Sequence, residues 1–216
     1  MHVELTDLFR CPVPHRDSWL VAAADRTEAR VILDGVLGCP ECGAEYPIRG
    51  GVARFDARTS QHGDYAANSD PEFAFRIAAL LGATDGSVTI ALVGTTTGLA
   101  RAIGSVVPVR CIVVDAADED FAVSALRIDG APLAIIRGNG TLPVARGVLG
   151  GVYAGSGDPA VYTAALRAGG RLVAPVACTV PAGITELARD GSHWVGERAG
   201  DTSTAPASLV ELRRRR

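Results

Sequence analysis

Ile90-Ala91-Leu92-Val93-Gly94-Thr95-Thr96-Thr97-Gly98-Leu99-Ala100 has a pattern that predicts a buried strand, a turn of small residues and the start of a helix. The apolar run before Gly94 is typical of a parallel strand with both faces covered. Gly94 and Gly98 leave room for a tight turn between strand and helix. The first turn of a helix presents free amides and the positive end of its dipole, so we expect a ligand-binding site beside Thr96.

Short apolar runs alternate with helical patterns on both sides of this segment, which predicts a parallel sheet covered by helices. The expected strands are Val88–Val93, Cys111–Val114, Leu133–Ile136, Gly151–Ala154 and Arg171–Val176. The expected helices between them are Thr97–Ile103, Asp118–Leu126 and Pro159–Ala168. Another helix is expected to begin at Asp70-Pro71, because the Asp side chain can cap free amides and Pro suits the first turn.

The C-terminal part of the chain has a different pattern. We expect a short helix near Ile184–Arg189, followed by two strands at Ser192–Arg198 and Ser208–Arg213, where apolar and polar residues alternate. These two strands are predicted to close the sheet as an antiparallel pair. The predicted fold class is therefore α/β, with a mostly parallel sheet and an antiparallel C-terminal pair.

Composition limits the classes of function. A formal net charge of −3 argues against a general nucleic-acid coat. All 21 basic residues are arginine, which excludes any mechanism that needs a lysine Schiff base. No apolar run is long enough to span a bilayer, and Met1–Asp7 lacks the pattern of a signal peptide. We therefore expect a cytoplasmic protein that does not enter the membrane.

The N-terminal quarter predicts a separate small β module over residues 1–55. Ser18–Ala22 and Arg30–Leu33 are short apolar stretches separated by the polar Asp25–Glu28, a pattern typical of a β-hairpin. A core this small needs a staple such as a metal ion. Residues 56–70 are polar and aperiodic and are interpreted as a linker, which leaves an α/β domain over residues 71–216.

Three of the five cysteines fall in this N-terminal module. Cys39 and Cys42 are three positions apart, so both thiolates can bind one ion. Cys11 is the third expected ligand, and His15 is the best fourth ligand nearby. Four N and S ligands satisfy tetrahedral zinc in a closed, structural site. The alternative is an isolated CxxC pair without metal.

A family resemblance rests on three segments of the module. Leu5–Pro12, Leu37–Cys42 and Tyr46–Val52 together resemble the Trm-type small zinc-ribbon family. The resemblance implies a zinc ribbon, and eukaryotic and archaeal members of the family stabilise and activate methyltransferases as obligate partners. This chain departs from the family at His15, where relatives often carry a second cysteine.

The α/β part, over about residues 71 to 213, resembles class I S-adenosylmethionine-dependent methyltransferases. The resemblance implies a Rossmann-like methyltransferase sheet. It also implies a cofactor site, whose first motif is matched by Gly94 and Gly98 with Thr96 between them. The resemblance makes Asp115 the ribose-binding acid. Asn139 lies where the family usually has an adenine-contacting aspartate. The turn Leu166–Val173 is similar to the family's glycine-rich entry into strand five.

This chain departs from the methyltransferase pattern at several positions. Leu92 stands where the family has an acid that helps to organise the methionine end of the cofactor. Thr96 replaces the central glycine, so its side chain can block close approach of a ligand to the backbone. The segment Leu149–Tyr153 carries no ionisable group except the tyrosine. If the domain is active, Tyr153 or Asp158 could act as a base or orient the substrate.

Three functions follow, from different classes. The leading hypothesis is a non-catalytic, methyltransferase-like binding or scaffold protein, a pseudoenzyme with structural zinc, degraded cofactor motifs and a protein partner or a second copy of itself. The rival is an active S-adenosylmethionine-dependent methyltransferase with its activator-like ribbon fused in cis. The third is an RNA-binding accessory factor, which rests on the ribbon and the basic tail Arg213–Arg216. The same tail is also interpreted as a solvated end of the last strand.

Overall fold

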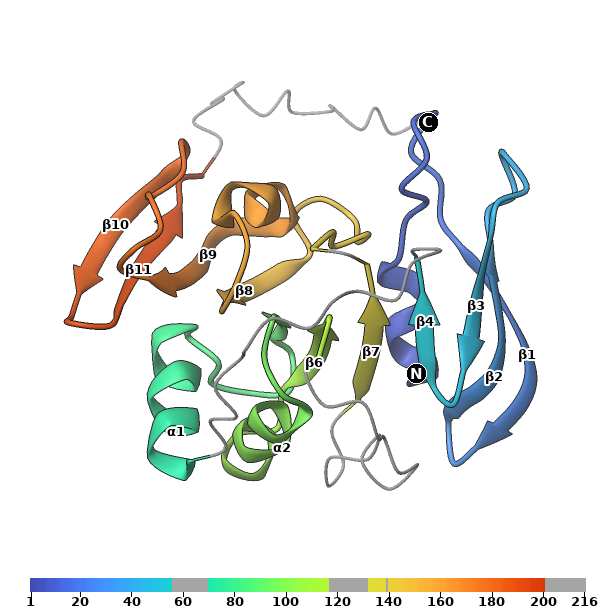
Figure 1. The fold of residues 1–216 in the computed structure, drawn as a ribbon, viewed down its shortest axis with the longest axis horizontal. Helices are drawn as coiled ribbons and strands as arrows, with labels where there is room; N and C mark the ends of the chain where they lie inside the picture. Colours follow the sequence, from blue (N-terminus) through green and yellow to red (C-terminus); the bar gives the residue numbers. More distant parts are fainter. Residues whose placement is uncertain (56–69, 117–131, 139, 201–216) are drawn as a thin grey trace, which may run out of the picture.

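A computed structural model describes residues 1–55, 70–116, 132–138 and 140–200 (Figure 1). Its strands form one 11-stranded sheet in the order β1-β2-β3-β4-β7-β6-β5-β8-β9-β11-β10. The sheet therefore runs without a break from the N-terminal strands to the C-terminal pair.

The centre of the sheet is parallel, as expected. It consists of β5 (Thr89–Val93), β6 (Arg110–Val114), β7 (Leu133–Arg137), β8 (Leu149–Ala154) and β9 (Leu166–Pro175). From β5 the chain first builds β6 and β7 on one side and then β8 and β9 on the other. In open α/β sheets such a reversal opens a crevice at the carboxyl ends of the strands. This topology confirms the predicted Rossmann-like α/β class.

Different elements cover the two faces of the parallel strands. On one face lie α1 (Pro71–Leu80) and α2 (Thr97–Val106), which share a core with Ile90 and Leu92. Asp70 caps α1 by accepting a hydrogen bond from the Glu72 amide, as predicted. On the other face, the 3-10 helices η1 (Val3–Leu8) and η3 (Pro159–Ala165) bury residues against a second core.

The N-terminal strands are β1 (Val21–Glu28), β2 (Val31–Gly38), β3 (Glu45–Arg49) and β4 (Val52–Arg54). The predicted hairpin is present as β1 and β2, but the polar residues 25–28 lie inside β1. The turn falls at Ala29 and Arg30, which both have positive φ (45° and 67°), the geometry of a tight two-residue hairpin. β4 then pairs in parallel with β7, so the module extends the central sheet.

The C-terminal end differs from the prediction. Ile184–Arg189 is strand β10 rather than a helix, and it pairs with β11 (His193–Arg198). β11 pairs with β9, so the closing antiparallel strands are β11 and β10. The backbone bonds to β11 override the helical preference of Glu186-Leu187-Ala188. Ser208–Arg213, the second strand of the predicted pair, lies outside the described residues.

The predicted helix Pro159–Ala168 is also shorter than expected. It is the 3-10 helix η3, and β9 begins at Leu166 because this residue pairs with Leu149. The predicted helix Asp118–Leu126 and nearly all of the linker 56–70 lie outside the described residues, so the domain boundaries stay predictions. No helix in the described part of the chain is long and apolar enough to cross a membrane.

Candidate functional site

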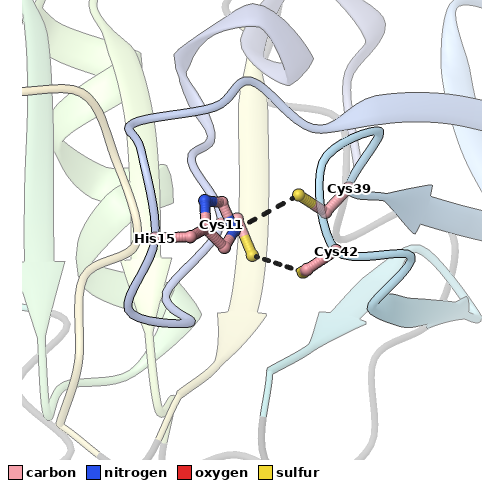
Figure 2. A group of neighbouring side chains, drawn as sticks. All are labelled: Cys11, His15, Cys39 and Cys42. Atoms are coloured by element: carbon pink, nitrogen blue, oxygen red, sulfur yellow. Dashed lines mark hydrogen bonds between the residues drawn. The ribbon is translucent and has the colours of Figure 1, made fainter.

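Two groups of functional candidates lie in different parts of the sheet. The first is the Cys/His cluster of the N-terminal module (Figure 2). Cys11 follows η1 and pairs its backbone with Ser18, and His15 lies in the loop between them. Cys39 and Cys42 lie in the turn between β2 and β3. The structure therefore brings together all four residues that the sequence predicts as ligands.

The distances within the cluster fit one tetrahedral ion. The four ligand atoms lie within 4.8 Å of one another. The sulfurs of Cys11 and Cys42 are 3.7 Å apart, and the Cys39 sulfur is 3.5 Å from Nε2 of His15. Tetrahedral zinc, with Zn–S bonds of about 2.3 Å, separates its sulfur ligands by roughly 3.8 Å. The side chains are thus spaced as a Cys3His metal site requires.

The backbone of the β2–β3 turn supports the two thiols. Gly43, with φ of 69°, lets its amide donate to the Cys39 carbonyl, and the Cys39 amide donates to the Ala44 carbonyl. Burial acts to raise the pKa of the Cys39 thiol, but hydrogen bonds from the amides of Cys42 and Glu41 outweigh it and lower the pKa to about 6. This turn therefore favours the thiolate form of Cys39, which is the form that binds metal. The hydrogen bond from the Ala44 amide acts in the same direction on Cys42, but burial and the neighbouring Cys39 and Cys11 outweigh it and raise the pKa of the Cys42 thiol.

Two further groups orient the remaining ligands. His15 Nδ1 lies 2.5 Å from the Arg16 carbonyl, so this nitrogen carries the proton and Nε2 faces the cysteines. Hydrogen bonds with Cys11 and with that carbonyl raise the pKa of His15 to about 9. The Tyr46 hydroxyl lies 3.4 Å from the Cys11 sulfur. Such outer contacts fix the orientation of metal ligands.

The second group lies at the carboxyl ends of β5, β6 and β7. Gly94 ends β5 with φ of 59°, and its amide donates to Val114 at the end of β6. Thr96 is the N-cap of α2 but makes no side-chain capping bond. Its side chain is buried, and its hydroxyl has no partner among the described residues. Gly98 lies in the first turn of α2.

Asp115, the expected ribose ligand, follows β6 directly. Its carboxylate accepts the Gly138 amide at 2.9 Å through Oδ1 and the Gly140 amide at 2.6 Å through Oδ2. Its φ of 50° lies in the left-handed region, which Asp tolerates better than most residues. Both oxygens thus already hold the loop after β7. Asn139, the expected adenine contact, lies in this loop but outside the described residues.

Leu92, at the position of the family's acid, is fully buried in the core beneath α1 and α2. It pairs across the sheet with Tyr153 of β8. Asp158, which the sequence suggested as a base, caps η3 by accepting the Ala160 amide at 2.9 Å. Leu92 therefore provides no carboxylate where the family has an acid. Asp158 has a structural role as the cap of η3.

Sequence analysis missed His193. Its Nε2 lies 3.3 Å from the Tyr153 hydroxyl, and its Nδ1 is buried with no partner in the described part of the chain. Burial and the nearby Arg76 lower the pKa of His193, whereas Asp190 acts in the opposite direction. Burial also raises the pKa of Tyr153. No motif marks His193 in the sequence, because the pair forms only when β11 joins the sheet beside β9.

Phe73 of α1 completes this cluster. Its ring contacts Tyr153 edge-on at 6.2 Å and lies 6.0 Å from the His193 ring. Arg76, one turn further along α1, approaches Asp190 at 3.7 Å. Tyr153 and His193 can share a proton beneath the Phe73 ring, close to the carboxyl end of β8.

Among known proteins, similarity is found to solved structures and not to family models or curated sequences. No protein-family model and no curated protein matches the sequence. Geranyl diphosphate C-methyltransferase from Streptomyces coelicolor A3(2), solved with Mg²⁺, geranyl-S-thiolodiphosphate and S-adenosyl-L-homocysteine, is similar at 20% identity and a TM-score of 0.41, over 48% of this chain and 42% of that chain. The tRNA (m1A58) methyltransferase TrmI from Aquifex aeolicus is similar at 12% identity and a TM-score of 0.42, over 65% of this chain and 71% of that one.

These similarities are too low to carry an activity from those enzymes to this chain. The chain spans less than half of the geranyl diphosphate methyltransferase that it matches. What the topology and the cluster define is a class: a Rossmann-like α/β protein whose mostly parallel sheet is extended by a small module with a potential Cys3His metal site.

Proposed function

We propose that this chain is a non-catalytic, methyltransferase-like binding protein of the cytoplasm, in which a zinc-bound N-terminal module and an α/β domain act as one scaffold for a protein partner. The proposal is carried by Asp115. A methyltransferase of this class would use such an acid for the cofactor ribose, but here both carboxylate oxygens accept backbone amides of the loop after β7. The residue has a structural task that does not require a cofactor.

Two other positions support the proposal. Leu92 is fully buried in the apolar core, so no charged group faces the methionine end of a cofactor from this position. Thr96 adds a side chain at the turn where a glycine would let the ligand approach the backbone. A lost hydrogen bond to a charged group weakens binding roughly ten- to a hundredfold. We therefore expect weak binding of S-adenosylmethionine at most.

The proposed zinc ion would be held by Cys11, His15, Cys39 and Cys42. Their donor set and spacing fit zinc in a closed structural site, with no ligand position left for substrate. When bound, zinc would supply folding energy and join the β2–β3 turn to the loop after η1. Such a site requires reduced thiols, which agrees with a cytoplasmic location.

A partner surface is available on the N-terminal module. Trp19 and Val21 have exposed fractions of 66% and 61%. They line a hollow of about 650 Å³ together with Arg10, whose guanidinium lies over the Trp19 ring. Exposed aromatic and arginine side chains around a hollow are typical anchors for a protein partner. We propose that the partner inserts an apolar side chain here.

Calorimetric titration with S-adenosylmethionine tests the non-catalytic function. We expect no binding in the low micromolar range. Low-micromolar binding by the wild-type protein would overturn the proposal, because the altered motifs would then still hold the cofactor. The zinc-loaded full-length protein should be used, so that a loss of folding is not mistaken for a loss of binding.

Elemental analysis tests the zinc site. Protein purified without chelator should contain one zinc per chain, and Cys42→Ser should contain much less. Cys178→Ser is the matched control, since Cys178 lies outside the cluster and should leave the zinc content unchanged. A wild-type protein without zinc would contradict this part of the proposal.

One observation favours the active methyltransferase as a second candidate. Tyr153 and His193 form a hydrogen-bonded pair beside the carboxyl end of β8, next to Leu92. This pair could accept a proton from a substrate nucleophile that is aligned with a methyl donor. If the chain is an active methyltransferase, it must bind the cofactor and transfer a methyl group, and Tyr153→Phe must lower the rate of methyl transfer. The RNA-binding hypothesis rests on the ribbon and on the basic tail Arg213–Arg216, and the tail lies outside the described residues.

A further inference from the structure

Three arginines line a pair of adjoining hollows far from both sites described above. One hollow, of about 510 Å³, has Arg146, Arg167 and Arg198 in its wall. The other, of about 390 Å³, shares Arg146 and Arg198 with the first. Because the two hollows also share Ala199, they adjoin each other, and together they are called the arginine-lined depression below.

The arginines come from three separate elements that meet at one edge of the sheet. Arg146 precedes β8, Arg167 is the second residue of β9, and Arg198 is the last residue of the antiparallel β11. This edge carries the amino ends of the parallel strands. It is therefore opposite to the carboxyl-end crevice that holds Asp115, and the depression is independent of that crevice.

The positive charge in this depression is not neutralised within the described part of the chain. Neither hollow has an acidic residue among its lining residues, and none of the three arginines forms an ion pair there. Outside the hollows, Arg167 makes a small contribution to the lowered pKa of Asp85, whose main cause is the hydrogen bonds from Ser87. Three such cations together repel one another, so an anion bound between them would be stabilised.

The depression is also organised to present these charges. Arg198 donates through Nη1 to the carbonyls of Ala164 and Leu166, which holds its guanidinium in place. The remaining walls are small residues such as Gly147, Ala168 and Ala199, which leave the backbone accessible. A volume of about 510 Å³ falls within the usual range of roughly 300–1,000 Å³ for ligand sites.

We propose that this depression binds a ligand with two or more linked phosphate groups. Planar guanidinium forks bind phosphate oxygens in pairs, and arginine suits this role better than lysine. Three forks that come from three separate elements match several phosphates rather than one. The phosphates could belong to a small diphosphate ester or to a nucleic-acid backbone, and both present the same chemistry to the arginines.

Calorimetric titration of the zinc-loaded full-length chain with inorganic pyrophosphate at low salt tests the proposal. We expect binding that weakens as salt rises. Arg146→Gln and Arg167→Gln should each weaken it roughly ten- to a hundredfold, since each removes hydrogen bonds to a charged group. Both side chains are exposed, so these variants should fold as the wild type does.

Arg101→Gln is the matched control. Arg101 is an exposed arginine of α2 that lines neither hollow, so it changes the net charge equally and should leave pyrophosphate binding unchanged. The proposal would be overturned if Arg101→Gln lost as much pyrophosphate affinity as the other variants, or if the wild type did not bind millimolar pyrophosphate. Competition by a short single-stranded RNA would identify a nucleic-acid backbone as the source of the phosphates. Pyrophosphate binding without such competition would identify a small diphosphate ligand.

Discussion

At the scale of single residues, Asp115 shows how one side chain can satisfy two interpretations. Its position after β6 matches a ribose-binding acid, yet its two oxygens accept the amides of Gly138 and Gly140. What the contacts establish is that Asp115 closes the loop after β7 across the end of the sheet.

Substitution of Asp115 should therefore destabilise the protein even without a cofactor. Asp115→Asn keeps one acceptor oxygen and should cost about 2 kcal/mol, whereas Asp115→Ala loses both bonds and should cost about 4 kcal/mol. The left-handed φ of 50° adds to the cost for alanine. Urea unfolding followed by tryptophan fluorescence measures both.

The matched control for Asp115 is Asp17→Asn. The side chain of Asp17 is 75% exposed and only approaches Arg10 at 3.8 Å. This variant should therefore unfold at the same urea concentration as the wild type. If Asp115→Ala is as stable as the wild type, then the two amide bonds do not hold the loop in solution.

We expect the stability of the protein to depend on pH because of His193. Because burial and Arg76 lower its pKa, the folded protein binds this proton less readily than the unfolded chain, whose histidine has a pKa near 6.5. The unfolded state then holds more protons below pH 6.5, so the contribution of His193 to stability is complete above that pH and is lost as pH falls.

The check is the pH profile of the free energy of unfolding for wild type and His193→Gln. The difference between the two proteins should be constant above about pH 6.5 and shrink as pH falls below it. Both proteins in this comparison keep His2, whose pKa burial also lowers, so the difference between their profiles reports His193 alone. Parallel profiles at all pH values would rule out a neutral buried His193.

At the scale of elements, close packing against glycines decides how helices sit on the sheet. A Cβ atom at Gly151 of β8 would lie 3.1 Å from both the Cβ atom and the carbonyl oxygen of Leu81, at the end of α1. Contacts this short are tighter than most Cβ atoms make, so a side chain at this position would force Leu81 to shift. The sequence Leu149-Gly150-Gly151 therefore serves the approach of α1 to β8, besides lacking the polar group of a methyltransferase motif.

Gly151→Val should move α1 away from the sheet and destabilise the protein by about 1–3 kcal/mol, the usual cost of overfilling a packed core. Thermal unfolding measures the loss. Gly191→Ala is the control, since nothing lies within 4 Å of a Cβ atom there. An unchanged melting temperature for Gly151→Val would contradict the tight packing of α1 on β8.

At the scale of the whole molecule, the N-terminal module is part of the central core. Met1, Leu5 and Phe9 are fully buried in the same cluster as Ile112 and Ile136 of the parallel strands. The backbone connects the two parts as well, because β4 pairs with β7 and the Phe55 amide donates to the Arg137 carbonyl. The module thus covers one face and one edge of the α/β sheet.

Residues 70–216 alone should therefore fail to fold cooperatively. Removing residues 1–55 would uncover the apolar face of β6 and β7 and leave β7 as an unpaired edge, which promotes aggregation. Co-expression with residues 1–55 should restore a soluble complex. Size-exclusion chromatography and thermal unfolding check both outcomes. A sharp melting transition for the isolated 70–216 fragment would show that the two parts are independent.

Local patterns were sufficient to predict much of this protein from sequence. The strand, turn and helix around Gly94, the cap at Asp70 and the four cysteine and histidine ligands all depend on residues close in the chain or on ligand chemistry. The helix predicted at Ile184–Arg189 was wrong, although the strand that becomes β11 was predicted, because local propensity did not show that residues 184–189 pair with that strand.

The sequence alone determined the five central strands, helices α1 and α2, and the four residues of the Cys/His cluster. Only the tertiary structure decided that β4 joins β7, that Tyr153 meets His193, and that Arg146, Arg167 and Arg198 surround one depression. These features pair residues separated by long stretches of chain. Local propensity and periodicity carry no information about such contacts, because the contacts depend on which strands become neighbours when the whole sheet assembles.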